Sequence, residues 1–206
     1  MTPYTLNLIT PPAVEPISLA LAQMHMRVDD QTDAAYISGL ITAARVYAEH
    51  YTRRAFITQT WDMKIDQFHY FDTRELIIPK APLQSVTYIQ YVDTAQNTQT
   101  LGASSYVVDS AQKPARIYPA FAQYWPATLP LQNSVTVRFV AGYGATQTDL
   151  NIAGSVPGTI IQGMLLLISH WYENREPVVA ERGVVPTEIP LAVDALLGSE
   201  TVIEFA

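Results

Sequence analysis

The sequence predicts an α+β fold: a small helical base, an antiparallel β-rich insertion and an extended C-terminal arm. Apolar residues recur at three- and four-residue steps in residues 33–52, which indicates a helix, and a near-continuous apolar run after Pro157 indicates another. In residues 56–145 the apolar period changes to two, which indicates strands. Prolines at 177, 186 and 190 then exclude a long regular helix. The predicted parts are a helical base (17–55 and 156–175), the β-rich insertion (56–145), the arm (176–206) and an extended N-terminal segment (1–16).

Two helices are expected before the insertion. Ser18 can cap a short helix of about residues 19–28, because its hydroxyl can accept a hydrogen bond from a free amide of the first turn. Thr32 or Asp33 would open the second helix, and Arg53 and Arg54 would end it, where cations complement the helix dipole. The apolar stripe of this second helix consists of Ile37, Leu40, Ile41, Ala44, Tyr47, Ala48 and Tyr51.

Short alternating segments follow, separated by turn residues such as Pro79, Pro82, Gly102 and Pro114. Several short strands at such spacing predict an antiparallel sandwich or a small barrel. The expected strands are 58–65, 76–78, 85–92, 98–101, 106–108, 115–118 and 134–140.

After the insertion comes a helix that is apolar almost all round. Pro157 suits its first position, where a missing amide hydrogen is tolerated. Because the run through Ile168 is apolar on nearly every side, the helix must be covered by the rest of the protomer and by neighbouring subunits. Within the arm only residues 191–197 read as helical, started by Pro190 and stopped by Gly198.

The composition favours a protein that binds other proteins. Only 15% of the 206 residues are charged, against roughly 25% in a typical soluble domain, while twelve Tyr, six Phe and three Trp are present. A neutral, aromatic surface is typical of protein–protein contacts. The lack of cysteine excludes disulfides and thiolate metal sites. No signal peptide is recognised at the N-terminus, and the apolar run at 160–168 is shorter than the ~20 residues that span a bilayer.

The charge pattern argues against a nucleic-acid ligand. Of the net charge of −7, residues 173–206 contribute seven acidic against two basic side chains. Non-specific DNA affinity comes from clustered cations, so we expect any DNA to pass this protein without specific binding.

Four motifs, in this order, resemble the head–tail connector, or adaptor, family of long-tailed bacteriophages, prophages and gene-transfer particles. The resemblance covers roughly residues 14–198. Its motifs are PISLA…MRVDD (16–30), YAEHYTRRAFITQTW (47–61), VRFVAGYG (137–144) and HWYENRE (170–176).

The resemblance implies a structural virion protein without catalysis or cofactors. It would form a closed ring of about twelve copies in the virion neck, after assembly in the host cytoplasm. The ring would join the portal to the stopper or tail and continue the DNA channel used in genome ejection. Apolar residues of the arm would contact the portal or neighbouring subunits, namely Ile189, Leu191, Val193, Leu196, Leu197, Ile203 and Phe205. Two other functions are retained: a stopper or tail-completion protein, and a receptor- or glycan-binding module of the particle.

Other residues invite functional interpretations that we weigh against structural ones. Arg53 and Arg54 could face a DNA channel or form ion pairs between subunits. His170 and Glu173 could share a metal, as a metal-dependent hydrolase would require, although a capped helix end is the simpler reading. Glu49 and His50 could be acid–base groups, but a solvated helix end with cations nearby explains them better.

An aromatic cluster lies in a proline-bounded loop of the predicted insertion. It would be an interface if exposed, or a cap on the β core if folded back, and a glycan-binding platform would require Trp125 to be exposed. The cluster consists of Tyr118, Phe121, Tyr124 and Trp125.

Overall fold

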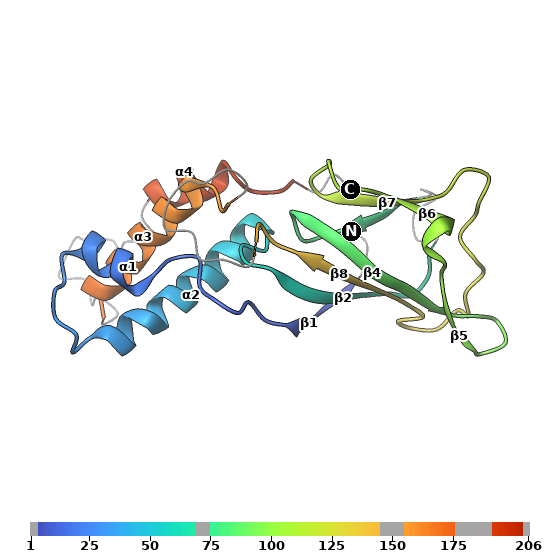
Figure 1. Ribbon diagram of the computed structural model, residues 1–206, viewed down its shortest axis with the longest axis horizontal. Coiled ribbons are helices and arrows are strands. Elements are labelled where there is room, and N and C mark those ends of the chain that lie inside the picture. The colour runs from blue at the N-terminus through green and yellow to red at the C-terminus, as the bar shows by residue number, and fades with distance from the viewer. Residues whose placement is uncertain (1–3, 69–74, 145–154, 176–190, 204–206) are drawn as a thin grey trace, which may run out of the picture. The chain divides into compact units, whose positions relative to one another are not determined.

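The computed structural model describes residues 4–68, 75–144, 155–175 and 191–203, which form two compact units. The β unit contains Met1–Pro12, Thr58–Tyr143 and Val202–Ala206, and the helical unit contains Ala13–Ile57 and Gly144–Thr201. The fold is thus α+β, with four α-helices and two antiparallel sheets in the described part of the chain (Figure 1).

The division differs from the predicted one at both ends of the chain. The N-terminal segment is split, because residues up to Pro12 belong to the β unit and those from Ala13 to the helical unit. The predicted arm is not wholly an extension, because residues 191–201 belong to the helical unit. Residues 176–190 of the predicted arm lie outside the described residues.

The first two helices start and end close to their predicted limits. Helix α1 spans Leu19–Met26, and the Ser18 hydroxyl accepts a 3.0 Å hydrogen bond from the Leu21 amide, which confirms the predicted cap. Helix α2 spans Ala34–Thr52, and its C-cap residue Arg53 adopts a left-handed conformation with φ 57°. The predicted stripe of α2 is its inner face, where Ile37, Ile41, Ala44 and Ala48 are buried.

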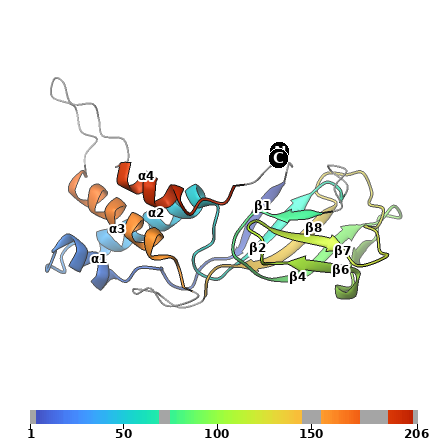
Figure 2. The ribbon, with the colours of Figure 1, turned by 90° about the horizontal axis from the view of Figure 1, so that it is seen from above.

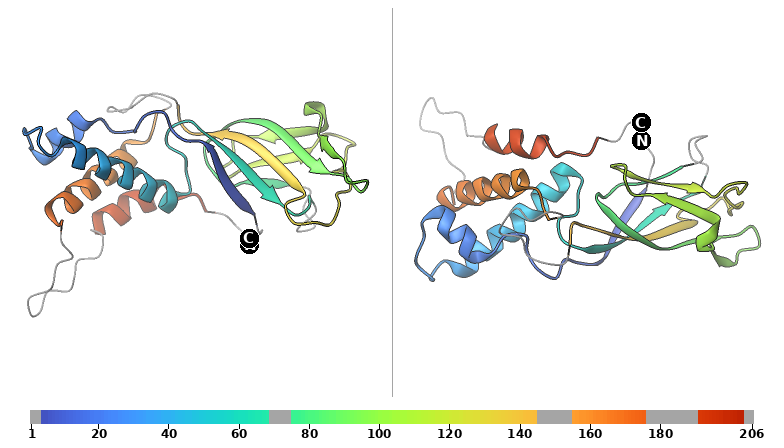
Figure 3. Two further views of the ribbon diagram at one scale, coloured as in Figure 1. Left: turned by 90° about the horizontal axis from the view of Figure 1, so that it is seen from below. Right: turned by 45° about the horizontal axis from the view of Figure 1, so that its top comes forward.

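Helix α3 is the central element of the helical unit. It spans Gly158–Glu173 and contacts α1, α2 and α4 (Figure 2). Pro157 precedes the helix as its cap rather than forming its first residue. Helix α4 spans Leu191–Gly198, as the sequence predicts, and lies beside α3 (Figure 3). The buried side chains of α3 are Ile160, Ile161, Met164, Leu165, Leu167 and Ile168.

The larger sheet of the β unit has five antiparallel strands in the order β1-β2-β8-β4-β5. Its members are β1 (Thr5–Thr10), β2 (Gln59–Ile65), β8 (Val135–Ala141), β4 (Leu83–Val92) and β5 (Thr98–Thr100). The register of β2 against β8 is continuous from Gln59↔Ala141 to Ile65↔Val135. Strand β8 shows the alternation that predicted it, because Val135, Val137 and Phe139 are buried and the residues between them are not.

The smaller sheet has three antiparallel strands in the order β3-β7-β6. These are β3 (Leu76–Ile78), β7 (Ala115–Pro119) and β6 (Tyr106–Asp109), with a short 3₁₀ turn (Ala103–Ser105) before β6. This sheet lies over one face of the larger one, which gives the predicted antiparallel sandwich (Figures 1 and 2). Apolar side chains of both sheets form its core, including Met63, Ile89, Val137, Phe139, Ile78 and Ile117.

No helix in the described ranges is both long enough and apolar enough to cross a membrane.

Candidate assembly surfaces

Helix α4 is packed against its own protomer. Val193 and Leu197 are fully buried, and the backbone of Gly163 in α3 allows Leu197 to approach closely, since a Cβ added there would lie 3.0 Å from Leu197 Cδ2. Val193 and Leu197 were predicted to contact the portal or a subunit, but both have their packing partners within the chain. Leu196 is half-buried, whereas Leu191 and Ile203 are 87% and 63% exposed. Ile189 and Phe205 lie outside the described residues.

Arg54 ties the end of α2 to the chain that follows α4. Its Nε donates a 2.6 Å hydrogen bond to the Glu200 carbonyl, and Nη2 lies 3.3 Å from the Glu200 carboxylate. The Thr159 hydroxyl donates to the same carboxylate at 2.9 Å. Because Arg54 is only 7% exposed, we remove it from the candidate channel-facing or inter-subunit residues. Arg53 is exposed and stays a candidate.

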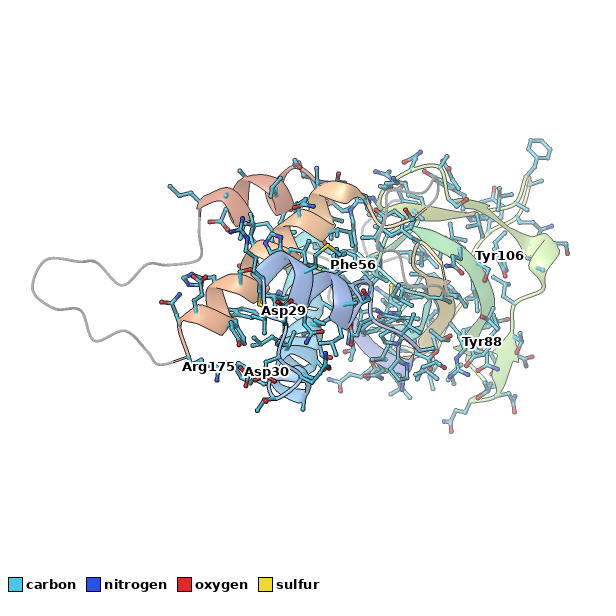
Figure 4. The ribbon with its side chains drawn as sticks, turned by 60° about the vertical axis from the view of Figure 1, so that its left-hand side comes forward. Asp29, Asp30, Phe56, Tyr88, Tyr106 and Arg175 are labelled. Carbon is cyan, nitrogen blue, oxygen red and sulfur yellow. The ribbon has the colours of Figure 1, made fainter. Side chains whose placement is uncertain are left out.

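Glu49 is buried rather than solvated, which corrects the sequence-based interpretation. One of its carboxylate oxygens accepts a 2.8 Å hydrogen bond from the Phe56 amide, and the other accepts a 3.0 Å bond from Arg45. Arg45 also donates to Glu15 at 2.7 Å. The bonds from Phe56 and Arg45 support a role for Glu49 in fixing the end of α2, and not in acid–base chemistry. Phe56 is buried just beyond (Figure 4).

A second side-chain cluster joins the start of α2 to the end of α3, and it consists of Asp33, Tyr36, Tyr172 and Arg175. The Arg175 guanidinium lies 4.7 Å from the ring centroid of Tyr36 and 4.6 Å from that of Tyr172. Asp33 accepts 2.6 Å hydrogen bonds from both Arg175 and the Tyr172 hydroxyl. These two donors hold the pKa of Asp33 below its ordinary value, and the Asp33 carboxylate in turn raises the pKa of Tyr172. Figure 4 shows Arg175 beside the loop that carries Asp29 and Asp30.

His170 contributes to the capped end of α3. Its carbonyl accepts hydrogen bonds from both the backbone amide of Asn174 at 3.0 Å and the side-chain amide of Asn174 at 2.8 Å. In the ranges that the structure describes, no three His, Cys, Asp or Glu side chains gather closely enough to hold a metal ion.

The aromatic loop of the β unit divides into a buried and an exposed part. Trp125 is 5% exposed and stacks on Phe68, with ring centroids 4.8 Å apart and planes 5° apart. It therefore caps the β core and does not offer the exposed platform that glycan binding would require. Phe121, by contrast, is 100% exposed and Tyr124 is 71% exposed.

Tyr118 belongs to a polar network at the base of this loop. Its hydroxyl donates a 2.9 Å hydrogen bond to Glu75, whose carboxylate also pairs with Arg116 at 2.7 Å. The sequence grouped Tyr118 with the other aromatic residues of this loop and left its exposure open, and this pairing places it in the structural framework of the smaller sheet.

Comparison with known proteins gives a match in structure alone. No family model and no curated protein matches the chain. A chain in the neck of an empty gene transfer agent (GTA) particle, computed with C6 symmetry, is 22% identical, with a TM-score of 0.76. The match covers 98% of this chain and 97% of that one. The two chains share one fold.

Two further solved structures agree. A chain from the virion of a native gene transfer agent particle is 21% identical with a TM-score of 0.74, and one from the neck of a native GTA particle, computed with C12 symmetry, is 21% identical with a TM-score of 0.72. Each match covers 98% of this chain and 97% of the other. The resemblance expected from the four motifs is thus confirmed at the level of the fold.

Proposed function

We propose that this chain is a structural protein of the neck of a phage-like particle. The main support is the structural similarity to a chain of a GTA neck, which covers 98% of this chain and 97% of that one at a TM-score of 0.76. A match of this extent includes both units, so it does not arise from a common β-sandwich or helix pair alone. The location proposed is the head–tail interface of the particle.

Within the neck, we assign the chain to the adaptor ring between the portal and the stopper or tail. The C6 and C12 symmetries of the similar necks support a closed ring of identical copies. The low charge of the chain supports extensive protein contact. Among the described residues of the C-terminal region, Leu191 and Ile203 are the exposed large apolar ones and are the candidates for portal or subunit contacts.

Contacts made by one or two apolar side chains suit a ring better than a single copy. Full burial of one such apolar side chain contributes ~1.5–3 kcal/mol, which the ordering of one or two residues offsets. Each contact is therefore weak by itself. In a ring, the first docked copy raises the effective concentration of the others, so weak contacts add up to firm attachment.

The proposed role in DNA passage is passive, and no catalytic activity is proposed. Arg54 pairs with Glu200, and Arg45 pairs with Glu15 and Glu49, so these cations already have anionic partners within the chain. DNA would pass the ring without a specific site, because such sites need clustered cations.

A gene deletion tests the neck assignment. Particles that lack this protein should accumulate as separate heads and tails in electron micrographs, and the wild-type chain supplied in trans should restore joined particles. Normal tailed particles in the deletion strain would contradict the proposal. A stopper or tail-completion protein would give the same deletion result, but only an adaptor should bind an isolated portal ring without other neck proteins.

A further inference from the structure

Strand β1 lies at the edge of the larger sheet and buries little of its own surface (Figure 3). Five of its six side chains are exposed, and Leu8 and Ile9 are each 44% exposed. Among the described elements, β1 packs closely on β2 alone. The strand is therefore held mainly by its backbone pairing with β2. Exposed edge strands are common in sheets, so this feature alone does not indicate a function.

The pairing of β1 with β2 is interrupted near its end. A bulge shifts the register between Leu8 and Thr10, so that Ile9 stands outside the ladder. Strands β2 and β8, in contrast, pair without interruption over seven residues. Because β1 combines little side-chain burial with an interrupted ladder, it is the strand of this sheet that opens at the lowest cost.

A short segment, Pro11 to Val14, connects β1 to the helical unit, and three of its four residues are exposed. Beyond it, Glu15 is fixed to α2, because its carboxylate accepts hydrogen bonds from Arg45 at 2.7 Å and from Thr42 at 2.9 Å. Two adjacent prolines restrict the segment even when β1 is released, since each proline fixes its own φ. A released strand therefore loses little further freedom when it pairs again.

The edge of β2 specifies which strand can take the place of a released β1. The ladder, the bulge and the facing side chains all fit β1, because this is the pairing that the structure shows. A second copy of the chain carries the identical strand and satisfies the same register without any new complementarity. A strand of another protein would have to reproduce both the register and the bulge. The observed pairing therefore favours a second copy as the occupant.

The N-terminal segment favours exchange of β1 over the addition of a further strand to its outer edge. No charged residue occurs in residues 1–14, so the segment lacks the charges that keep many edge strands from pairing with other chains. The bulge and the prolines at 3, 11 and 12 discourage a new strand from pairing along the outer edge of β1. Neither feature hinders β1 from pairing with an identical β2.

We infer that β1 is exchanged between neighbouring copies in the assembled ring, so that the strand of each copy pairs with β2 of the next. This inference rests on the proposed function, because the ring holds the copies side by side. The connecting segment sets the range, since the five Cα–Cα steps from Thr10 to Glu15 span at most roughly 18 Å. Exchange is thus confined to adjacent copies and links them head to tail.

Cysteine crosslinking tests the exchange, because the chain has no cysteine of its own. Thr5→Cys and Lys64→Cys are combined in one full-length chain, since these two residues face each other across β1 and β2. The reduced variant is assembled on the purified portal ring of the same particle and is then oxidised. We expect a ladder of covalently linked copies on a non-reducing gel. The unassembled variant should instead close the disulfide within one chain.

Two further variants control the experiment. Thr5→Cys combined with Thr98→Cys places the second cysteine in β5, at the opposite edge of the sheet. This pair should give at least about tenfold fewer linked copies, because cysteines that do not face each other cannot form a disulfide. Thr10→Cys combined with Thr60→Cys uses the last pair of the register and repeats the test if the first variant does not assemble.

Different results would overturn different statements. Disulfides confined to single chains in the assembled ring would overturn the exchange and leave the proposed function intact. Equal ladders from the Thr98→Cys control would show unspecific contact between copies and would also overturn it. So would loss of the internal disulfide without links between copies, since β1 would then pair with another protein. If the wild type does not bind the portal, the adaptor function itself fails, and the exchange with it.

Discussion

Gly163 of α3 and Leu197 of α4 are in such close contact that a Cβ at position 163 would lie 3.0 Å from Leu197 Cδ2 and 3.2 Å from Cγ. The missing side chain is what lets α4 pack on α3, and burial of Leu197 follows from it. We expect Gly163→Ala to lower the free energy of unfolding by about 1 kcal/mol, because overpacking outweighs the gain in helix propensity. Gly163→Val should lower it further. Urea unfolding followed by circular dichroism measures both.

Gly39 in α2 is the matched control, because it is exposed and a Cβ there would meet nothing within 4 Å. Gly39→Ala should raise the free energy of unfolding by roughly 0.5–1 kcal/mol, since alanine favours the helix. Equal stabilisation by Gly39→Ala and Gly163→Ala would contradict close packing between α3 and α4.

Arg54 and Arg53 should differ sharply despite being neighbours. Arg54→Ala leaves the Glu200 carboxylate without its ion pair and the Glu200 carbonyl without its donor. We expect a loss of about 2–3 kcal/mol, at or below the lower end of the range for broken buried pairs because Glu200 is partly exposed. Arg53→Ala, at an exposed position, should change stability by less than about 0.5 kcal/mol. Similar losses for both variants in urea unfolding would argue against the structural role of Arg54.

The cluster of Asp33, Tyr172 and Arg175 should make stability depend on pH at both extremes. Hydrogen bonds from Tyr172 and Arg175 hold the pKa of Asp33 below its ordinary value of 3.8. The contribution of this carboxylate to the free energy of unfolding is therefore present above about pH 4. It is lost as the pH falls through the lowered pKa of the folded state. The pKa of Tyr172 is raised above 10.0, so its contribution is present below pH 10 and is lost at higher pH.

Asp33→Asn should flatten the acid side of this profile, and Tyr172→Phe the alkaline side. The measurement is the urea midpoint from pH 2.5 to pH 11 for the wild type and both variants. Parallel profiles for all three proteins would show that the cluster does not contribute to stability.

Trp125 and Phe121 should have opposite roles although they lie in one loop. Trp125→Ala removes the ring that stacks on Phe68 and should reduce stability by about 3–5 kcal/mol. Phe121→Ala removes a fully exposed ring and should change stability by less than about 0.5 kcal/mol. Thermal unfolding of the two variants is the check. A stable Trp125→Ala variant that had lost binding on a glycan array would revive the glycan-binding alternative.

The local periodicity of the sequence was sufficient to predict most of the secondary structure. Seven of the eight strands in the described ranges fall where the sequence predicts strands. The alternation is clearest in β8, because one of its faces is buried and the other is partly exposed. Strand β1 was expected only as an extended segment. Five of its six side chains are exposed, so it has no buried face that could impose an alternating pattern.

The partners of individual residues were not predictable, because they lie far apart in the sequence. Arg54 meets Glu200 across 146 positions, and Asp33 meets Arg175 across 142. Arg54 stands at a helix end, where attraction to the helix dipole was a sufficient explanation. The aromatic loop shows the same limit, since composition could not distinguish the buried Trp125 from the exposed Phe121. Both are large aromatic residues, which occur in cores and at interfaces alike.

The most direct test of the adaptor function is the molar mass of the full chain by light scattering, alone and mixed with a purified portal ring of the same particle. We predict a stable complex with one copy of this chain per portal subunit, whether the chain alone is a monomer or a ring. A well-behaved monomer in both samples, with no complex at any ratio, would contradict the adaptor role.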